Sequence, residues 1–348
     1  MKKEQEEKTI TLLAAGDVLL GVRIQKIDGT ATEPVRQNPA TAFTLIAPTL
    51  KSADIGFCNL EAPLAETGKP VLGRIMAFRS SPKMVEGLTY AGFDLINLAN
   101  NHTMDYGPDA CVETLEVLAA NKLPTIGAGR NIAEARKPVF LERKGTRFGF
   151  LGYTTSENQP QHFAAGTNKP GVAPIRISTL FHPPHTNDED MEMMIEDIQT
   201  ARSQADVLIV SCHWSVGLMG GSHTLTVHQP AVTRAAIDAG ADLVIGHGPH
   251  AIQAVEVYKG KAIFYNLGNF VVDRDTPIKD SLLLKCIVTG KKISQVSFLP
   301  VLINKEGQPC LLAAEDENCA KIHKIMEKLS GKLGTHLTFI GAEGVVEM

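Results

Sequence analysis

The sequence has no apolar run of the roughly 18–20 residues that a membrane-spanning helix needs. Its charged N-terminal stretch, MKKEQEEK, also lacks the apolar core of a secretory signal. Basic residues are not in excess, since the 348 residues carry a formal net charge of -4, so a nucleic-acid partner is not expected. The six cysteines show no CxxC spacing and are typical of buried, reduced thiols. These absences predict a soluble, cytoplasmic protein. If an N-terminal anchor has been removed, the extracytoplasmic face of a membrane is the alternative.

Short apolar runs, each followed by Asp, Glu, Asn or His, are the main pattern of the chain. They cover residues 9–15, 54–58, 94–99, 206–212, 242–245 and 262–265. Runs without alternation predict strands that are buried on both faces of a sheet. Segments of helical period lie between them, at 42–52, 82–91, 108–121, 189–203 and 229–239. The alternation predicts an α/β fold with parallel strands, whose carboxyl ends meet at one edge.

Two regions have the pattern of antiparallel strands. Residues 140–154 predict a hairpin with Gly145 in its turn, and residues 251–300 predict several further strands. We therefore expect two sheets packed face to face, with helices outside, in a single domain of residues 8–348. Residues 155–188 are rich in Pro, Asn, Gln and His and are interpreted as a lid-like insertion. Residues 303–348 are expected to close the domain with a helix and a strand.

Polar residues at the strand ends predict a metal centre. The candidate ligands, each following a predicted strand, are Asp17, Glu61, Asn101, His213, His247 and His250. Imidazole with carboxylate and amide oxygen suits a divalent ion, Mn²⁺ or Zn²⁺, with Fe as a further candidate. Two such ions can acidify a bridging water and hold the oxygens of a reacting group.

Each candidate also has a purely structural interpretation. Asp17 could cap a turn, Glu61 could be a solvated loop acid, and Asn101 could belong to an ordinary polar turn. His213 could be a core histidine. Two imidazoles around a Gly-Pro turn, at His247 and His250, contribute little to packing. The joint occurrence of all six at equivalent strand ends favours the metal centre.

Short motifs in a fixed order carry a resemblance to a known family. They are GDVL at 16–19, NLE at 59–61, NNHTMDYG at 100–107, HW at 213–214, GHGPH at 246–250 and NLGNF at 266–270. In this order, over residues 9 to about 273, they resemble the CapA family of poly-γ-glutamate capsule biosynthesis, within the metallophosphoesterase-like (calcineurin-like) superfamily. The resemblance implies a four-layer α/β/β/α sandwich and metal ligation by the six candidates.

The resemblance also implies roles beside the metal. It makes His102 the catalytic acid that steadies the reacting oxygen or protonates the leaving group, which suits a side chain with a pKa near neutrality. Asp105 would orient that imidazole, or would cap the helix that starts near Pro108. Asn59 and Asn269 are candidates for contacts with substrate or with the ligands. Trp214, the only tryptophan, would line the pocket or serve packing.

Three departures from the pattern concern the metal positions. Classical metallophosphoesterases open with Asp-x-His, whereas Leu19 stands at the histidine position here. Glu61 replaces the usual bridging aspartate, and Gly248 replaces the second histidine of Gly-His-His-Pro-His. The departures predict that one metal position is weak, differently built or empty, and fold alone does not establish phosphoester hydrolysis.

The expected function is metal-dependent hydrolysis of a γ-glutamyl polymer, a peptide or a phosphoester, with a membrane capsule-synthase complex as a candidate partner. Three alternatives stay open. The chain could be a non-catalytic metal-binding component of that complex, a stand-alone intracellular metallophosphatase, or a peptide Cα epimerase with His102 as base.

Overall fold

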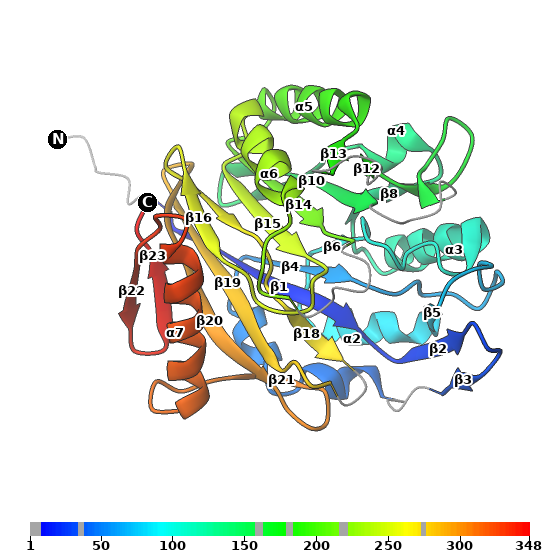
Figure 1. The fold of residues 1–348 in the computed structure, drawn as a ribbon, viewed down its shortest axis with the longest axis horizontal. Coiled ribbons are helices and arrows are strands. Elements are labelled where there is room, and N and C mark those ends of the chain that lie inside the picture. Colours follow the sequence, from blue (N-terminus) through cyan, green and yellow to red (C-terminus); the bar gives the residue numbers. More distant parts are fainter. Residues whose placement is uncertain (1–7, 34–37, 157–162, 179–183, 216–221, 273–275) are drawn as a thin grey trace.

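The computed structural model describes residues 8–33, 38–156, 163–178, 184–215, 222–272 and 276–348 (Figure 1). Strand β1 (Ile10–Leu19) lies inside the first large sheet. Its strand order is β22-β23-β20-β19-β1-β4-β6-β7, with β18 also paired to β1 and β21 to β20. The bounds are β4 (Ile55–Leu60), β6 (Leu95–Asn97), β7 (Thr125–Ile126), β18 (Asn269–Val272), β19 (Asp280–Thr289), β20 (Lys292–Ile303), β21 (Pro309–Leu311), β22 (Leu337–Ile340) and β23 (Glu343–Val346). Strands β4, β6, β7 and β18 continue the sheet in parallel, whereas β19 runs antiparallel to β1.

The second large sheet has the order β13-β12-β10-β14-β15-β17-β16, with β9 paired to β10. Its core strands β10, β14, β15 and β17 are parallel. The bounds are β9 (Val139–Arg143), β10 (Thr146–Ser156), β12 (Pro174–Ser178), β13 (His185–Thr186), β14 (Val207–His213), β15 (Leu243–His247), β16 (Val255–Tyr258) and β17 (Lys261–Phe264). Two small sheets join β2 (Val22–Lys26), β3 (Ala31–Thr32) and β5 (Met76–Ser80), and β8 (Ala128–Gly129) with β11 (Gly171–Val172).

Helices cover the outer faces of the two large sheets (Figure 1). Side chains of α1, α2 and α3 share one apolar cluster with the first sheet, and those of α5 and α6 share another with the second. A third cluster joins the two sheets, with the Phe57 and Phe150 rings stacked at 6.1 Å. The bounds are η1 (Pro39–Phe43), α1 (Ala47–Lys51), η2 (Pro82–Met84), α2 (Val85–Ala91), α3 (Gly107–Ala120), α4 (Ile132–Ala135), α5 (Asp188–Arg202), α6 (His228–Ala239) and α7 (Glu317–Gly331).

Adjacent residues of the central strands enter different clusters, which explains the continuous apolar runs. Leu12 packs between the sheets and Leu13 packs against the helices. Ile209 and Val210 divide in the same way. Because both faces of each strand are buried, alternation with polar residues is absent. The prediction of a mixed α/β fold is confirmed.

The predicted helix at 42–52 is divided into η1 and α1 by a proline. Pro48 lies in the first turn of α1, where its missing N–H costs nothing. A helix continuing through this position would lose one backbone hydrogen bond and would bring the ring against the carbonyl of Thr44. Helix η1 therefore ends at Phe43, and a new helix starts at Ala47.

The segment 155–188 is more regular than its composition suggests. Strand β12 extends the second sheet as a parallel neighbour of β10, and β13 pairs with β12 in antiparallel orientation. Residues 157–162 and 179–183, on which the lid interpretation also depends, lie outside the described residues. The C-terminal stretch contains α7 and the hairpin β22–β23. Among the described residues, no helix combines the length and apolar character needed to cross a bilayer.

Candidate metal centre

A row of polar side chains crosses the first sheet at the carboxyl ends of its parallel strands. Asp17 on β1 is in register with Asn269 on β18 and with Asn59 on β4, and Asn59 is in register with Asn97 on β6. Asn59 Nδ2 donates to Asp17 Oδ1 at 2.8 Å, and Asn97 Nδ2 donates to Asn59 Oδ1 at 2.9 Å. The row orients the Asp17 carboxylate before any ligand binds.

The second sheet brings histidines to the same edge. His213 and His247 are the last residues of β14 and β15 and are in register with each other. The loop after β15 reaches Asp17, where Gly248 N donates to Asp17 Oδ2 at 3.1 Å. His250 Nδ1 lies 3.6 Å from Asp17 Oδ2, and His247 Nδ1 lies 3.5 Å from Asp17 Oδ1. The site therefore combines both sheets.

Two carboxylates are fully buried here. Glu61, directly after β4, lies with Oε1 3.3 Å from His213 Nε2 and Oε2 3.8 Å from His250 Nδ1. Donor atoms of Asp17, Glu61 and His250 all lie within 4.8 Å of one another. Buried carboxylates are costly unless a positive charge balances them. Protonated histidine or a cation must supply that charge.

The pKa values of Asp17 and His250 follow from this proximity. Burial alone would raise the pKa of the Asp17 carboxyl, but the adjacent imidazoles of His247 and His250, together with positive charge at His247 and His213, outweigh burial and hold this pKa far below its usual value. Burial would likewise lower the pKa of His250. The charge of Glu61 and the hydrogen bond to Asp17 outweigh burial and raise the pKa to about 9.

Several buried polar atoms of the candidate ligands have no hydrogen-bond partner. Among the described residues, the buried atoms without a hydrogen bond include Glu61 Oε2, Asn101 Oδ1, His213 Nδ1 and both ring nitrogens of His247. Buried polar atoms are nearly always paired, and each one left unpaired costs about 1–3 kcal/mol. Oxygen and imidazole nitrogen atoms of this kind fit the donor set of a divalent transition metal.

His250 occupies a strained position next to the cluster. Its φ of 62° lies in the left-handed region, which few residues other than glycine adopt. Its Nδ1 lies 2.8 Å from Asn269 Oδ1, so Asn269 holds the ring. The side chain is one-third exposed, whereas His213, His247 and both carboxylates are buried. The cluster is thus open on the side of His250.

His102 and Asp105 form a pair beside the cluster. His102 Nδ1 lies 2.6 Å from Asp105 Oδ2, and the ring stacks on Phe78 with centroids 4.0 Å apart. Phe78 N also donates to Asp105 Oδ2, at 2.7 Å. The first residue before α3 is Tyr106, and no side chain caps the helix there. The carboxylate of Asp105 therefore orients His102 and is not a helix cap.

Comparison with known proteins agrees with the motifs. Residues 11–274 match the family model described as bacterial capsule synthesis protein PGA_cap. The PGA biosynthesis protein CapA of Bacillus subtilis is 30% identical over 87% of this chain and 74% of its own length. The chain belongs to the CapA family. The capsule biosynthesis protein CapA of Bacillus anthracis is 27% identical over 95% of this chain and 76% of its own.

Two further comparisons of this CapA-family chain show weaker similarity. A probable polyglutamine synthesis accessory protein of Mycobacterium tuberculosis is 24% identical over 93% of this chain and 92% of its own. Among solved structures, GAP50, titled the anchor in the inner membrane complex of Plasmodium, has a TM-score of 0.44 at 11% identity over 84% of each chain. That likeness is too low to support a conclusion about fold or function.

Local packing accounts for two departures of this chain from the family pattern. Gly248 has φ of 107°, and a Cβ there would lie 2.4 Å from Trp214 O and 2.9 Å from His213 Cε1. A histidine at 248 would therefore not fit without moving the loop. Leu19 is buried with Ala62 and Phe78 in an apolar cluster. A leucine side chain offers no ligand atom at that position.

Trp214 is fully buried and belongs to the cluster shared with α5 and α6. Its Nε1 donates to Tyr265 O at 2.7 Å, and its backbone N donates to His247 O at 2.8 Å. With no exposed surface, the indole serves packing, which was one of the two interpretations from sequence. The tryptophan also ties the loops after β14 and β15 to each other.

Three residues of the site were missed by sequence reasoning. Asn100 accepts hydrogen bonds from the backbone N–H groups of His102 and Thr103, both at 3.0 Å, and so shapes the loop. Asn97 continues the polar row, and Arg74 donates to Asp105 Oδ1 at 2.8 Å. The doubled asparagine at 100–101 was a signal for Asn100. No sequence pattern pointed to Arg74.

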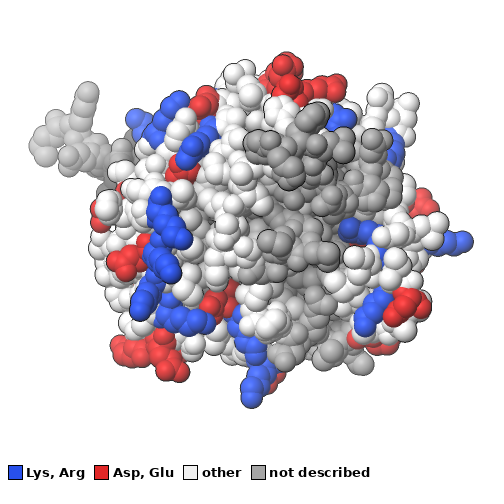
Figure 2. Space-filling model, in the orientation of Figure 1, with Lys and Arg blue, Asp and Glu red and all other residues white. Residues whose placement is uncertain are grey.

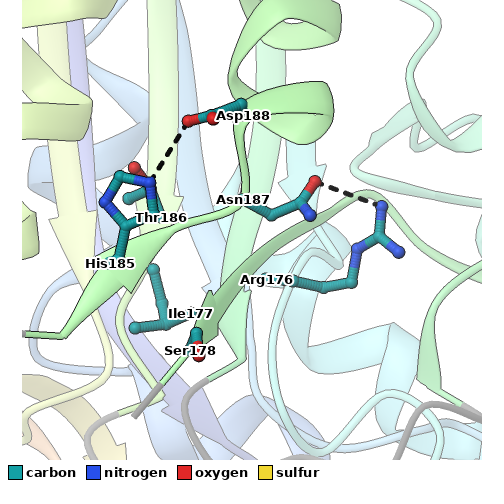
Figure 3. Close-up of a pocket in the computed structure, with 7 residues that line it drawn as sticks. All are labelled: Arg176, Ile177, Ser178, His185, Thr186, Asn187 and Asp188. Atoms are coloured by element: carbon teal, nitrogen blue, oxygen red, sulfur yellow. Dashed lines mark hydrogen bonds and ion pairs between the residues drawn. The ribbon is translucent and has the colours of Figure 1, made fainter. Parts of the chain in front are cut away.

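One pocket lies apart from the centre, between β12, β13 and the start of α5 (Figure 3). The Arg176 guanidinium there bonds Asp190 Oδ2 through Nε at 2.7 Å, and its terminal nitrogen lies 3.4 Å from Asn187 Oδ1. His185 and Asp188 form an ion pair at 3.3 Å.

On the face shown in Figure 2, basic and acidic side chains are intermixed over the described surface.

Proposed function

We propose that this CapA-family chain is a metal-dependent hydrolase that acts in poly-γ-glutamate capsule biosynthesis. The proposal depends above all on one observation: buried atoms of Glu61, Asn101, His213 and His247 have no hydrogen-bond partner, and three of these residues lie against Asp17 or against one another. Such a cluster is costly in a protein that leaves it unfilled. The family membership supports the biological setting.

The cation would be held by side chains from both sheets: Asp17, Glu61, Asn101, His213, His247 and His250. Nitrogen and oxygen donors without thiolate favour Mn²⁺ or Zn²⁺, with Fe as a further candidate. The thiol of Cys58 does not change this, because burial raises its pKa well above the usual value. A cation bound here would supply Lewis acidity and lower the pKa of bound water.

His102 would move the proton. Its Nδ1 is engaged by Asp105, which leaves Nε2 as the ring atom that can exchange a proton with a reactant. Stacking on Phe78 fixes the plane of the ring. Asn59 orients Asp17, and Asn269 orients His250, so both asparagines support the ligands.

The substrate class follows from the relatives and from the chemistry of the site. The names of the Bacillus relatives refer to PGA and capsule biosynthesis. We therefore propose a γ-glutamyl polymer or peptide as substrate, or a phosphoester, and a membrane capsule-synthase complex as partner. We further propose that the two sheets and their covering helices form the four-layer α/β/β/α sandwich of metallophosphoesterases.

One observation favours a second candidate function. Because Leu19 is buried among apolar side chains where metallophosphoesterases carry a histidine, one metal position lacks a ligand. A non-catalytic metal-binding component of the synthase complex would have no need for that ligand. This candidate predicts bound metal without turnover.

Elemental analysis combined with a substrate panel tests the proposal. Purified protein is assayed with Mn²⁺ or chelator on phosphomonoesters, phosphodiesters, γ-glutamyl peptides and poly-γ-glutamate. We expect His247→Ala to remove metal and turnover together. The control is His323→Ala, which should retain both, because the His323 ring contacts Ala342 O and none of the candidate ligands. Turnover by metal-free protein would refute the hydrolase. Metal without any turnover would favour the second candidate, and deuterium uptake at Cα without hydrolysis would favour an epimerase.

A further inference from the structure

Arg74 contacts both the proposed metal ligand Asn101 and the His102–Asp105 pair. Its Nε donates to Asp105 Oδ1 at 2.8 Å, and one terminal nitrogen donates to Asp105 Oδ1 and to the backbone carbonyl of Asn101. The same nitrogen lies 3.5 Å from His102 Nδ1. A single guanidinium thus touches three functional residues of the loop at 101–105: Asn101, His102 and Asp105.

The surroundings hold the guanidinium in this place. Its carbon lies 4.7 Å from the centre of the Phe163 ring, a distance typical of a cation–π contact. Val71 N, in the same loop as Arg74, donates to the carbonyl of Asp105 at 2.9 Å. The Arg74 side chain is only 13% exposed, so water competes weakly for these contacts.

The geometry requires the planar fork of an arginine. The acceptors are a carboxylate oxygen and a backbone carbonyl, and both are reached by one rigid group. A lysine ammonium on its flexible stem is a point charge without this fork. The carbonyl of Asn101 belongs to the residue whose side-chain Oδ1 is one of the buried atoms without a partner. Fixing this peptide therefore fixes the backbone from which that side chain extends.

We propose that Arg74 is a positioning residue, which locks the loop at 101–105 so that Asn101 Oδ1 faces the cation and Asp105 orients His102. The inference rests on the proposed metal site. It acts on that site from outside, because the guanidinium is occupied by protein acceptors. Residues that orient ligands in this way typically change metal affinity by about 10- to 100-fold when they are removed.

The test compares Mn²⁺ affinity by isothermal titration calorimetry in the full chain and three variants. Arg74→Met removes the contacts, and Arg74→Lys keeps the charge without the fork. Arg136→Met is the matched control, because Arg136 also donates to a carboxylate, Asp197, and to a backbone carbonyl, that of Met193, both at 2.7 Å. The Arg136 side chain is similarly enclosed, at 18% exposure.

We expect Arg74→Met to raise the Mn²⁺ Kd by about 10- to 100-fold. Arg74→Lys should raise it by at least about threefold, since the ammonium cannot serve both acceptors. The Mn²⁺ Kd of Arg136→Met should stay within about twofold of the parent value. Its melting temperature should fall, as that of Arg74→Met should, because each variant loses contacts of an enclosed guanidinium. If the Kd of Arg74→Met lies within twofold of the parent value, the positioning role of Arg74 is wrong, while the proposed metal site stands. Where the methionine variant does not fold, the same criterion applies to Arg74→Lys. A parent protein that binds no Mn²⁺ would overturn the proposed function together with this inference.

Discussion

Removing the cation should measurably lower the stability of the folded protein. Without metal, the buried donor atoms of Glu61, Asn101, His213 and His247 keep the cost of missing partners, about 1–3 kcal/mol for each unpaired group. Under the proposed function, Mn²⁺ would bind only where these residues are gathered, that is, in the folded state. A ligand present at 1,000 times its Kd therefore stabilises the fold by about 4 kcal/mol.

This free energy converts into a shift of the melting temperature. The unfolding entropy is about 2.1 cal/mol/K per residue, which for 348 residues amounts to about 0.7 kcal/mol/K. Saturation with Mn²⁺ should then raise the melting temperature by about 5–6 °C relative to protein with chelator. Differential scanning calorimetry at matched ionic strength measures the shift.

Two variants decide whether the shift comes from the proposed centre. His213→Ala removes a donor that lies 3.3 Å from Glu61, so the shift should disappear. His323→Ala removes a histidine that stacks on Phe339 elsewhere in the fold, so the shift should remain although the protein is less stable overall. An equal Mn²⁺ shift in the parent and in His213→Ala, or no shift in the parent at millimolar Mn²⁺, would refute the reasoning.

Further predictions concern the loops around the centre. Gly248→Ala places a Cβ 2.4 Å from Trp214 O at φ of 107°, and urea unfolding should show a loss of about 1–3 kcal/mol. Trp214→Phe leaves the carbonyl of Tyr265 without its donor and should cost about 1–3 kcal/mol, while the Mn²⁺ Kd changes little. In metal-free protein, the raised pKa of His250, about 9, contributes stability that is fully present below pH 6.5 and is lost as the pH rises through 9. Thermal melts from pH 6 to pH 10 measure this loss, and His250→Gln should remove its contribution.

Each of these predictions has an opposite outcome. A Gly248→Ala protein as stable as the parent would mean that the loop has room for a side chain. A large loss of Mn²⁺ affinity in Trp214→Phe would give the indole a role beyond packing. An unchanged pH profile in His250→Gln would show that another group accounts for the loss of stability at high pH.

Much of the fold and of the centre was predictable from local sequence. The apolar runs became β1, β4, β6, β14, β15 and β17, because a strand buried on both faces needs apolar side chains at consecutive positions. Asp17 and Glu61 lie near each other, as do His213 and His247, because neighbouring parallel strands of one sheet end at the same edge regardless of their separation along the chain. Packing of the two sheets then brings the two pairs together. His102 and Asp105 are close in sequence, and their contact needs only one turn.

Other features depend on pairings between distant segments, which no local pattern contains. The register of Asn269 with Asp17 joins residues on β18 and β1, and Trp214 is buried in a cluster to which α5 and α6 contribute. Arg74 belongs to a loop without periodicity, and its partners become partners only when that loop lies against residues 101–105. Composition and spacing thus determined which residues carry donor atoms suited to a cation. Tertiary structure decided which atoms are left without partners, because burial and hydrogen bonding are properties of the assembled sheets.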